Sequence, residues 1–228
     1  HHQLLQKQLN TEHVFLVGGG IRDLLLNLID EPYDIDVTMP GNPGDIRDKM
    51  SFDETQMSRF KTDKFGTMTL IPKDQKADKQ IQYEITPFRT EWGYGDFRHP
   101  DEIDRSNNLL ADSERRDFRI NCVYRYAVPT RELPSSDKQI TISTNPELDK
   151  ALETYHNLLF PQQQVLILQD HDTIAHIFSE GKFQTQELNK LLDTVQIVLT
   201  EDTVDTAYDS LNILIDPQRG LQDLINKN

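Results

Sequence analysis

The first pattern along the chain is a short apolar run followed by glycines. Residues 14–17 (VFLV) are four consecutive apolar residues, a length and composition typical of a buried strand. Residues 18–20 are all glycine, which lets a backbone turn tightly and approach a ligand without a Cβ in the way. The pattern predicts a strand, a turn and then an amphipathic helix that starts at about Ile21, with free backbone N–H groups aimed at the turn.

The next predicted element is a strand with one polar face. In the segment YDIDV, Ile35 and Val37 fall on one face, whereas Asp34 and Asp36 fall on the other. Carboxylates spaced in this way lie roughly 7 Å apart and repel each other unless a cation lies between them. Mg²⁺ suits such a pair because it takes oxygen ligands and accepts others from substrate phosphates. The pair could equally be the polar face of an edge strand, but the preceding glycine turn and Arg22 favour a phosphate-binding site.

A second region combines two adjacent arginines with an acid and an amide. Arg115, Arg116, Asp117 and Asn121 fall within two turns of a helix-compatible stretch, where several can share a face. Two arginines offer planar donor forks to separate phosphoryl oxygens. The other interpretation is a basic helix end that complements its own dipole.

Other patterns predict further elements. Strands are expected at 65–72 and 77–86 as a hairpin and at 163–169, helices at 45–51 and 183–200, and a surface loop at 92–108. In the second strand of the hairpin, Glu84 is an acid on a polar face between the apolar Tyr83 and Ile85. It is either a partner of the two aspartates or an ordinary solvated residue.

Four blocks in this order resemble a known family. They are LVGGGIRDLLL with DIDVT at 16–38, YEITPFRTEWGYGDFRHP at 83–100, LADSERRDFRINCV at 110–123 and LIDPQRGLQDL at 214–224. The family is that of the class II tRNA nucleotidyltransferases and bacterial poly(A) polymerases, in the DNA polymerase β-like superfamily. The resemblance covers about residues 13–127 and 212–225. It implies an α/β head with a mixed, mostly antiparallel sheet and helices.

The resemblance also implies roles for individual residues. In that family the Asp-x-Asp pair binds two catalytic Mg²⁺ ions, which assigns Asp34 and Asp36, and Glu84 matches a third acid. The implied nucleotide-binding residues are Gly18, Gly19, Arg22, Arg115, Arg116, Asp117 and Asn121. Among these, Arg116 matches an arginine that contacts the nucleotide. The implied reaction transfers CMP or AMP from CTP or ATP to the 3′-hydroxyl of tRNA, which is synthesis or repair of the CCA end. Poly(A) addition stays open, as does a non-catalytic module that senses nucleotides or binds another protein.

Charge separates the second half of the chain from the first. The formal net charge is −14, and residues 128–211 hold 5 basic and 14 acidic residues. The family makes this connection with a short turn. We therefore expect a head at 3–127, an acidic inserted subdomain, α/β or mainly helical, at 128–211, and the end of the head at 212–228. Deletion of residues 130–210 with the ends rejoined is expected to preserve nucleotide binding. His171, Asp172 and His176 within the insertion are expected to be a solvated helix start rather than a metal site.

The ends of the chain and its composition give further expectations about missing domains and cellular location. Members of the family continue beyond this point into a neck that reads the base and into a body and tail that hold tRNA. We expect a continuation after Asn228 or a protein partner to supply these parts, so the choice among CCA, CC, A and poly(A) addition is not encoded here. No apolar run is long enough for a membrane span, and Cys122 is expected to be a small buried thiol, so a cytoplasmic enzyme is expected. His1 and His2 are expected to be tag residues.

Overall fold

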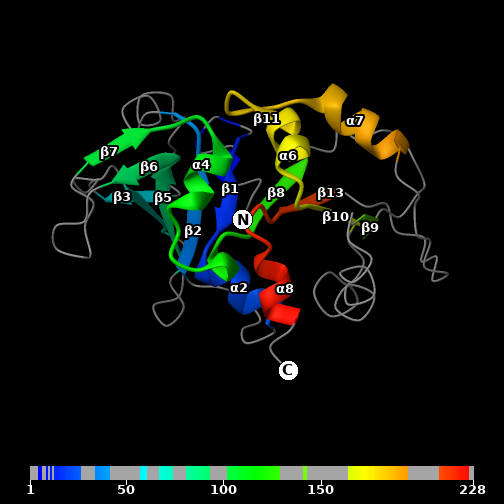
Figure 1. Ribbon diagram of the computed structural model, residues 1–228. Coiled ribbons are helices and arrows are strands. Elements are labelled where there is room, and N and C mark those ends of the chain that lie inside the picture. The colour runs from blue at the N-terminus through cyan, green and yellow to red at the C-terminus, as the bar shows by residue number, and fades with distance from the viewer. Residues whose placement is uncertain are drawn as a thin grey trace.

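A computed structural model provides the three-dimensional structure (Figure 1). It describes residues 5–6, 9, 11, 13–26, 34–41, 57–60, 67–73, 81–92, 102–128, 141–142, 164–194 and 211–225. Within these residues, the frame is a nine-stranded sheet with the order β3-β4-β5-β2-β1-β8-β13-β10-β9.

The bounds of the elements are as follows. The strands of the large sheet are β1 (Phe15–Val17), β2 (Asp34–Met39), β3 (Met57–Phe60), β4 (Met68–Pro72), β5 (Gln82–Pro87), β8 (Tyr124–Val128), β9 (Thr141–Ile142), β10 (Gln164–Leu168) and β13 (Leu211–Ile215). Two small sheets pair β6 (Arg89–Trp92) with β7 (Glu102–Arg105) and β11 (Phe178–Ser179) with β12 (Lys182–Phe183). The helices are α2 (Gly19–Leu25), α4 (Leu109–Glu114), α6 (His171–Ile177), α7 (Thr185–Thr194), α8 (Gly220–Ile225) and the 3₁₀ turn η1 (Arg119–Asn121).

The large sheet is mixed and mostly antiparallel, as predicted. Among its described strands, five pairs are antiparallel and three are parallel. The predicted hairpin is confirmed, because β4 and β5 pair antiparallel. Strand β5 also pairs with β2 in parallel, and this pair carries the acidic residues of interest.

Both faces of the sheet are covered at β1, which explains why the first strand is apolar at every position. Val14 and Leu16 face a core that includes residues of α2 and α8. Phe15 and Val17 face a second core that includes residues of α4, α6 and α7. Figure 1 shows the two groups of helices on opposite sides of the strands. A strand buried on both faces loses the alternation that a half-exposed strand displays.

The expected inserted subdomain is not confirmed, because the described part of 128–211 is built into the head. Strand β10 pairs in parallel with β13 over five residues and extends the same sheet. Ile174 and Ile177 of α6 are buried in the core that contains Phe15. The predicted strand at 163–169 and part of the predicted helix at 183–200 are confirmed as β10 and α7. The division of the chain into domains stays a prediction.

Asp216 joins this part of the chain to α8. Its buried carboxylate accepts hydrogen bonds from the backbone N–H groups of Gly220 (2.6 Å) and Leu221 (3.1 Å), and from Nε2 of Gln169 (2.7 Å). The first two bonds satisfy N–H groups at the start of α8, and the third comes from the turn after β10. A Cβ on Gly220 would lie 2.1 Å from the backbone oxygen of Arg119, so glycine lets α8 approach η1 closely.

Several predicted elements differ from the structure. Helix α2 begins at Gly19, two residues earlier than predicted. The segment predicted as a loop at 92–108 contains β7, because residues 102–105 pair with β6, and it ends at Asn108, the N-cap residue of α4. Helix α4 ends at Glu114, so the two arginines that follow lie in a turn and not on a helix face. The predicted helix at 45–51 lies outside the described residues.

Other expectations agree with the structure. His171, Asp172 and His176 are exposed on α6, as expected for a solvated helix start. Cys122 is buried, and its burial raises the pKa of the thiol to about 11, so the thiol stays protonated. No helix in the described ranges is long and apolar enough to cross a membrane.

Candidate active site

Three acidic residues share one face of the sheet. Asp36 on β2 and Glu84 on β5 are register partners in the parallel pair, and Asp34 lies two residues before Asp36 on the same face. Asp34 and Glu84 are exposed and Asp36 is partly buried. The apolar residues between them, Ile35 and Tyr83, face the opposite core. The alternation predicted from the sequence therefore brings the three predicted acids to one surface.

The surroundings of Asp36 perturb its carboxyl group. Burial raises the pKa of its carboxyl group, and the charge of Asp34 raises it further. The positive charge of Arg116 and a hydrogen bond from the backbone N–H of Gly19 act in the other direction, but the net pKa is raised. A cation beside Asp36 and Asp34 would relieve this electrostatic cost.

Gly18 leaves room for Asp36. A Cβ at position 18 would lie 2.3 Å from Oδ2 of Asp36, which is closer than any real contact. The φ angle of Gly18 is also +82°, a conformation that favours glycine. Since Val17 and Asp36 are register partners in β1 and β2, the glycine turn passes directly over the carboxylate. Free backbone N–H groups were predicted at the start of the helix that follows the turn, and the N–H of Gly19, its first residue, donates to Asp36.

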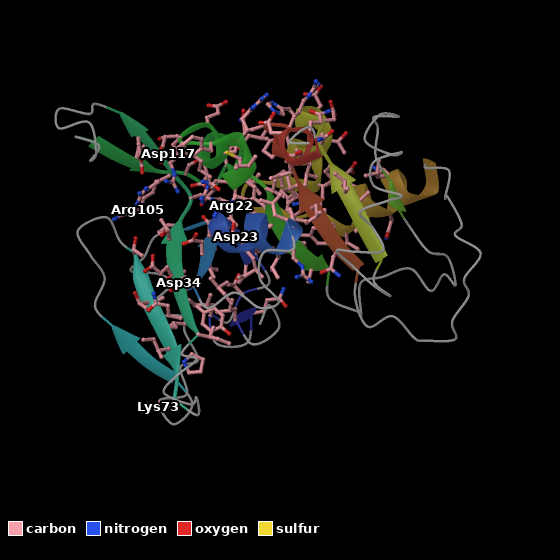
Figure 2. The ribbon with its side chains drawn as sticks, turned by 90° about the horizontal axis from the view of Figure 1, so that it is seen from below. Arg22, Asp23, Asp34, Lys73, Arg105 and Asp117 are labelled. Atoms are coloured by element: carbon pink, nitrogen blue, oxygen red, sulfur yellow. The ribbon has the colours of Figure 1, made fainter. Side chains whose placement is uncertain are left out.

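Arg22 connects the glycine helix to the later turn. Its Nε donates to Oδ1 of Asp23 at 2.6 Å, and its Nη1 donates to Oδ1 of Asn121 at 3.1 Å. Arg22 and Asn121 are 99 residues apart in the sequence, so the fold joins two predicted nucleotide-binding residues. In the view of Figure 2, Arg22 and Asp23 lie side by side on α2, and Lys73 lies well away from them.

The two predicted arginines diverge from one buried carboxylate. Arg115 donates from Nε to Oδ1 of Asp112 at 2.9 Å, and Arg116 donates from Nη2 to Oδ2 of the same residue at 2.9 Å. The hydroxyl of Tyr124 also donates to Oδ2, at 2.9 Å. Asp112 is 0% exposed. The two guanidinium groups are therefore each held in place, and they point in different directions.

Glu91 forms an ion pair with Arg115 through a guanidinium nitrogen that does not bind Asp112. Nη1 of Arg115 lies 3.3 Å from Oε1 of Glu91, which also accepts a hydrogen bond from Arg89. Glu91 belongs to β6 and Arg115 follows α4, so these ion pairs attach the β6–β7 sheet to the end of α4. Arg115 is thereby engaged in structural contacts on both sides.

The residues that follow the arginines point outward. Asp117 is exposed and makes no hydrogen bond or ion pair with the part of the chain that the structure describes. Phe118 is 64% exposed. Asp117 lies near Arg105 in Figure 2.

The three acids have suitable chemistry for Mg²⁺, which prefers oxygen ligands and keeps several waters. The raised pKa of Asp36 is the observation that fits a cation here. Within the described ranges, however, no group of three acidic, histidine or cysteine side chains converges on one metal position. The assignment of Asp34, Asp36 and Glu84 as metal ligands stays a prediction.

The sequence did not identify three residues that organise the site. They are Asp112, Glu91 and Tyr124. The spacing of four residues between Asp112 and Arg116 was a visible signal, since such pairs meet on a helix. Nothing local indicated that Glu91 and Tyr124, from β6 and β8, would complete the network.

Comparison with known proteins identifies related sequences. The model of the family described as "Poly A polymerase head domain" matches residues 14–134. The CCA-adding enzyme of Lactobacillus gasseri is 40% identical over 109 residues, which are 48% of this chain and 24% of that protein. The CCA-adding enzyme of Enterococcus faecalis is 37% identical over 120 residues, 51% of this chain and 26% of that protein. The chain thus spans about a quarter of the length of these relatives.

Two solved structures match part of the chain. An apo form of a CCA-adding enzyme has 28% identity and a TM-score of 0.37, and covers 49% of this chain and 24% of its own. The Bacillus stearothermophilus CCA-adding enzyme in complex with CTP has 23% identity and a TM-score of 0.35, with coverages of 53% and 27%.

Proposed function

Because this chain belongs to the poly(A) polymerase head-domain family, we propose that it is the catalytic head of a template-independent RNA nucleotidyltransferase. The proposed reaction is attack by the 3′-hydroxyl of a tRNA on the α-phosphate of CTP or ATP, with release of pyrophosphate. One structural observation carries the proposal. The acids Asp36 and Glu84 are register partners on one face of the sheet, and the charge of Arg116 acts on Asp36.

The arginines and the glycine turn form the proposed nucleotide side of the site. Arg116 is held in place and its charge is close enough to influence Asp36, so a triphosphate between them would meet both a cation and the acids. Arg22 and Asn121 approach from α2 and η1. Exposed Asp117 is available for a sugar hydroxyl. Fixed donors of this kind stabilise charge in the transition state without reorganising during the reaction.

Asp34, Asp36 and Glu84 would hold two Mg²⁺ ions. When bound, such ions lower the pKa of the attacking hydroxyl and neutralise charge on the triphosphate. The protein residues supply position and charge, and the reaction needs no covalent protein intermediate. The fold places Asp36 beneath the glycine turn, where the carboxylate has little freedom to move.

CCA-end synthesis is the proposed task, because relatives at 36–40% identity are named CCA-adding enzymes. The family model itself is named after poly(A) polymerase, and both activities would use the same acids and arginines. The substrates distinguish them. A CCA-adding enzyme extends a tRNA that lacks its CCA end by three nucleotides and stops, whereas a poly(A) polymerase extends many RNA ends with AMP alone.

A direct test follows the length of the RNA. The protein that contains this chain is incubated with Mg²⁺, CTP, ATP and a tRNA that lacks CCA, and the 3′ end is resolved on a sequencing gel. Addition of three nucleotides, absent when Mg²⁺ is chelated, is the expected result. Extension by AMP on unrelated RNA would favour poly(A) addition. A protein that neither extends RNA nor binds nucleotide in a Mg²⁺-dependent way would be a non-catalytic module, and the proposal would be wrong.

A further inference from the structure

Asp112 is a fully buried carboxylate with a different partner on each oxygen. Oδ1 accepts from Arg115, at 2.9 Å from Nε and 2.8 Å from Nη2. Oδ2 accepts from Arg116, at 2.9 Å from Nη2 and 3.2 Å from Nε, and from the hydroxyl of Tyr124 at 2.9 Å. Oδ1 also accepts the backbone N–H of Arg89 at 3.4 Å. Because each oxygen binds one guanidinium group, the two guanidinium groups cannot exchange places without breaking both sets of bonds.

The charge on Asp112 depends on these partners. Burial alone would raise the pKa of its carboxyl group, but Arg116 and Arg115 outweigh burial and hold the pKa below its ordinary value. A buried carboxylate is costly unless it is paired and hydrogen-bonded. The buried charge of Asp112 is therefore stable only with both arginines in place. In turn, the two oxygens of Asp112 fix the directions of the two guanidinium groups.

Arg116 is restrained on several sides and retains free donors. Its Nε and Nη2 are bound to Asp112, and Nε also donates to the Tyr124 hydroxyl at 3.1 Å. Its guanidinium carbon lies 5.3 Å from the centroid of the Tyr124 ring. Nη1 has no partner in the part of the chain that is described, and the side chain is 14% exposed. Arg115, in contrast, uses Nη1 for Glu91.

We propose that Asp112, together with the hydroxyl of Tyr124, is a positioning residue that aims Nη1 of Arg116 at a phosphate of the bound nucleotide. The inference rests on the proposed function, because it requires that Arg116 binds the triphosphate. The bonds to Asp112 orient Arg116 toward the ligand and Arg115 toward Glu91 of the β6–β7 sheet. An arginine that is fixed before binding loses less conformational freedom when it grips a phosphate, so the nucleotide binds more tightly.

A double-mutant cycle tests this assignment. The Kd of CTP with Mg²⁺ is measured by calorimetry for the wild-type protein, Asp112→Asn, Arg116→Ala and the double variant, with Asp172→Asn on exposed α6 as the control. Asp112→Asn should weaken CTP binding roughly tenfold, and the double variant should bind no more weakly than Arg116→Ala. CMP should respond much less, because it lacks the β- and γ-phosphates. Asp172→Asn should match the wild type.

The possible outcomes separate the two proposals. If the wild-type protein binds no CTP, the proposed function fails. If Arg116→Ala weakens CTP binding but folded Asp112→Asn does not, or if the two losses add in the double variant, the positioning role is wrong. Should Asp112→Asn fail to fold by circular dichroism, Tyr124→Phe decides the question, because it removes one shared hydroxyl and keeps the ring. It should weaken CTP binding roughly threefold, and an unchanged Kd would overturn the assignment.

Discussion

Asp36 on β2 and Glu84 on β5 stand opposite each other in a parallel strand pair, 48 residues apart in the sequence. Neighbouring strands in a sheet lie roughly 4.8 Å apart, so the two carboxylates start from adjacent backbone positions. Asp34 shares their face but lies farther along the strand and is exposed. If these acids hold two Mg²⁺ ions, Asp36 has the central place, because it neighbours both of the others.

This relationship predicts the effect of neutralising the acids. Asp36→Asn and Glu84→Gln keep the side-chain shape and remove one negative charge each. Nucleotidyl transfer by the intact protein should fall at least about 100-fold for Asp36→Asn, since no neutral amide replaces a metal-binding carboxylate. Single-turnover extension of tRNA is the measurement, with Asp172→Asn as the control. A rate within about tenfold of the wild type, which is roughly 1.4 kcal/mol of barrier, would remove the altered acid from the metal site.

Gly18→Ala should disturb the same carboxylate by steric means. The added methyl group would lie 2.3 Å from Oδ2 of Asp36, and alanine is also strained at a φ of +82°. Gly41→Ala is a matched control, because Gly41 has a φ of +112° and nothing within 4 Å of its Cβ position. Both variants should lose about 1 kcal/mol or more of stability through backbone strain. Only Gly18→Ala should also weaken Mg²⁺-dependent CTP binding, and equal CTP affinities in the two variants would contradict this account.

Arg116→Lys tests whether geometry or charge matters at this position. Lysine keeps the positive charge but cannot bind Asp112 with one edge and a phosphate with the other. The affinity for CTP and ATP should fall together by roughly 1–3 kcal/mol, since the expected contact is to phosphate. Calorimetric titrations with both nucleotides measure this. A loss confined to one of them would show that Arg116 reads the base.

Local patterns predicted the face on which the acids lie, but not their neighbours. The alternation in DIDV and YEI follows from the two-residue period of a strand, so the sequence alone shows which side chains share a face. The register that sets Asp36 beside Glu84 depends on how two distant strands align, which no short segment encodes. The burial of Asp112 similarly depends on Tyr124, which arrives from β8. The resemblance to a family supplied the order of the blocks, and the structure supplied the contacts between them.

The packing of the 128–211 segment could not be predicted from the sequence for the same reason. Its acidic composition suggested a separate unit, whereas Leu166, Ile174 and Ile177 are buried in the core of the head. Strand β10 pairs in parallel with β13, which lies more than 40 residues later, so no short turn motif in the sequence predicts this pairing. The structure therefore argues against the expectation that removal of this segment leaves nucleotide binding intact.

Ile174→Ala tests the integration of this segment. Ile174 is 1% exposed on α6, and truncating a buried isoleucine costs roughly 2–5 kcal/mol. If α6 stabilises the head, urea denaturation should show one transition at a lower midpoint, and CTP binding should be lost with it. Ala175→Ser, at an exposed neighbouring position, is the control. Two separate transitions, with only one shifted and CTP binding unaffected, would restore the independent subdomain.

The 228-residue chain by itself should bind CTP, ATP, GTP and UTP with similar affinity and add nucleotides to tRNA poorly. The predicted contacts from Arg22, Arg116 and the acids are to phosphates and metals, and discrimination among bases requires donors and acceptors aimed at their edges. The net charge of −14 also offers few sites for RNA phosphates. Titrations with the four nucleotides and Mg²⁺ should give dissociation constants within roughly threefold of one another, because about 0.7 kcal/mol or less would separate them. CMP serves as the control for phosphate dependence. A preference for CTP or ATP of tenfold or more, or faithful CCA addition by the chain alone, would show that base recognition resides within these 228 residues.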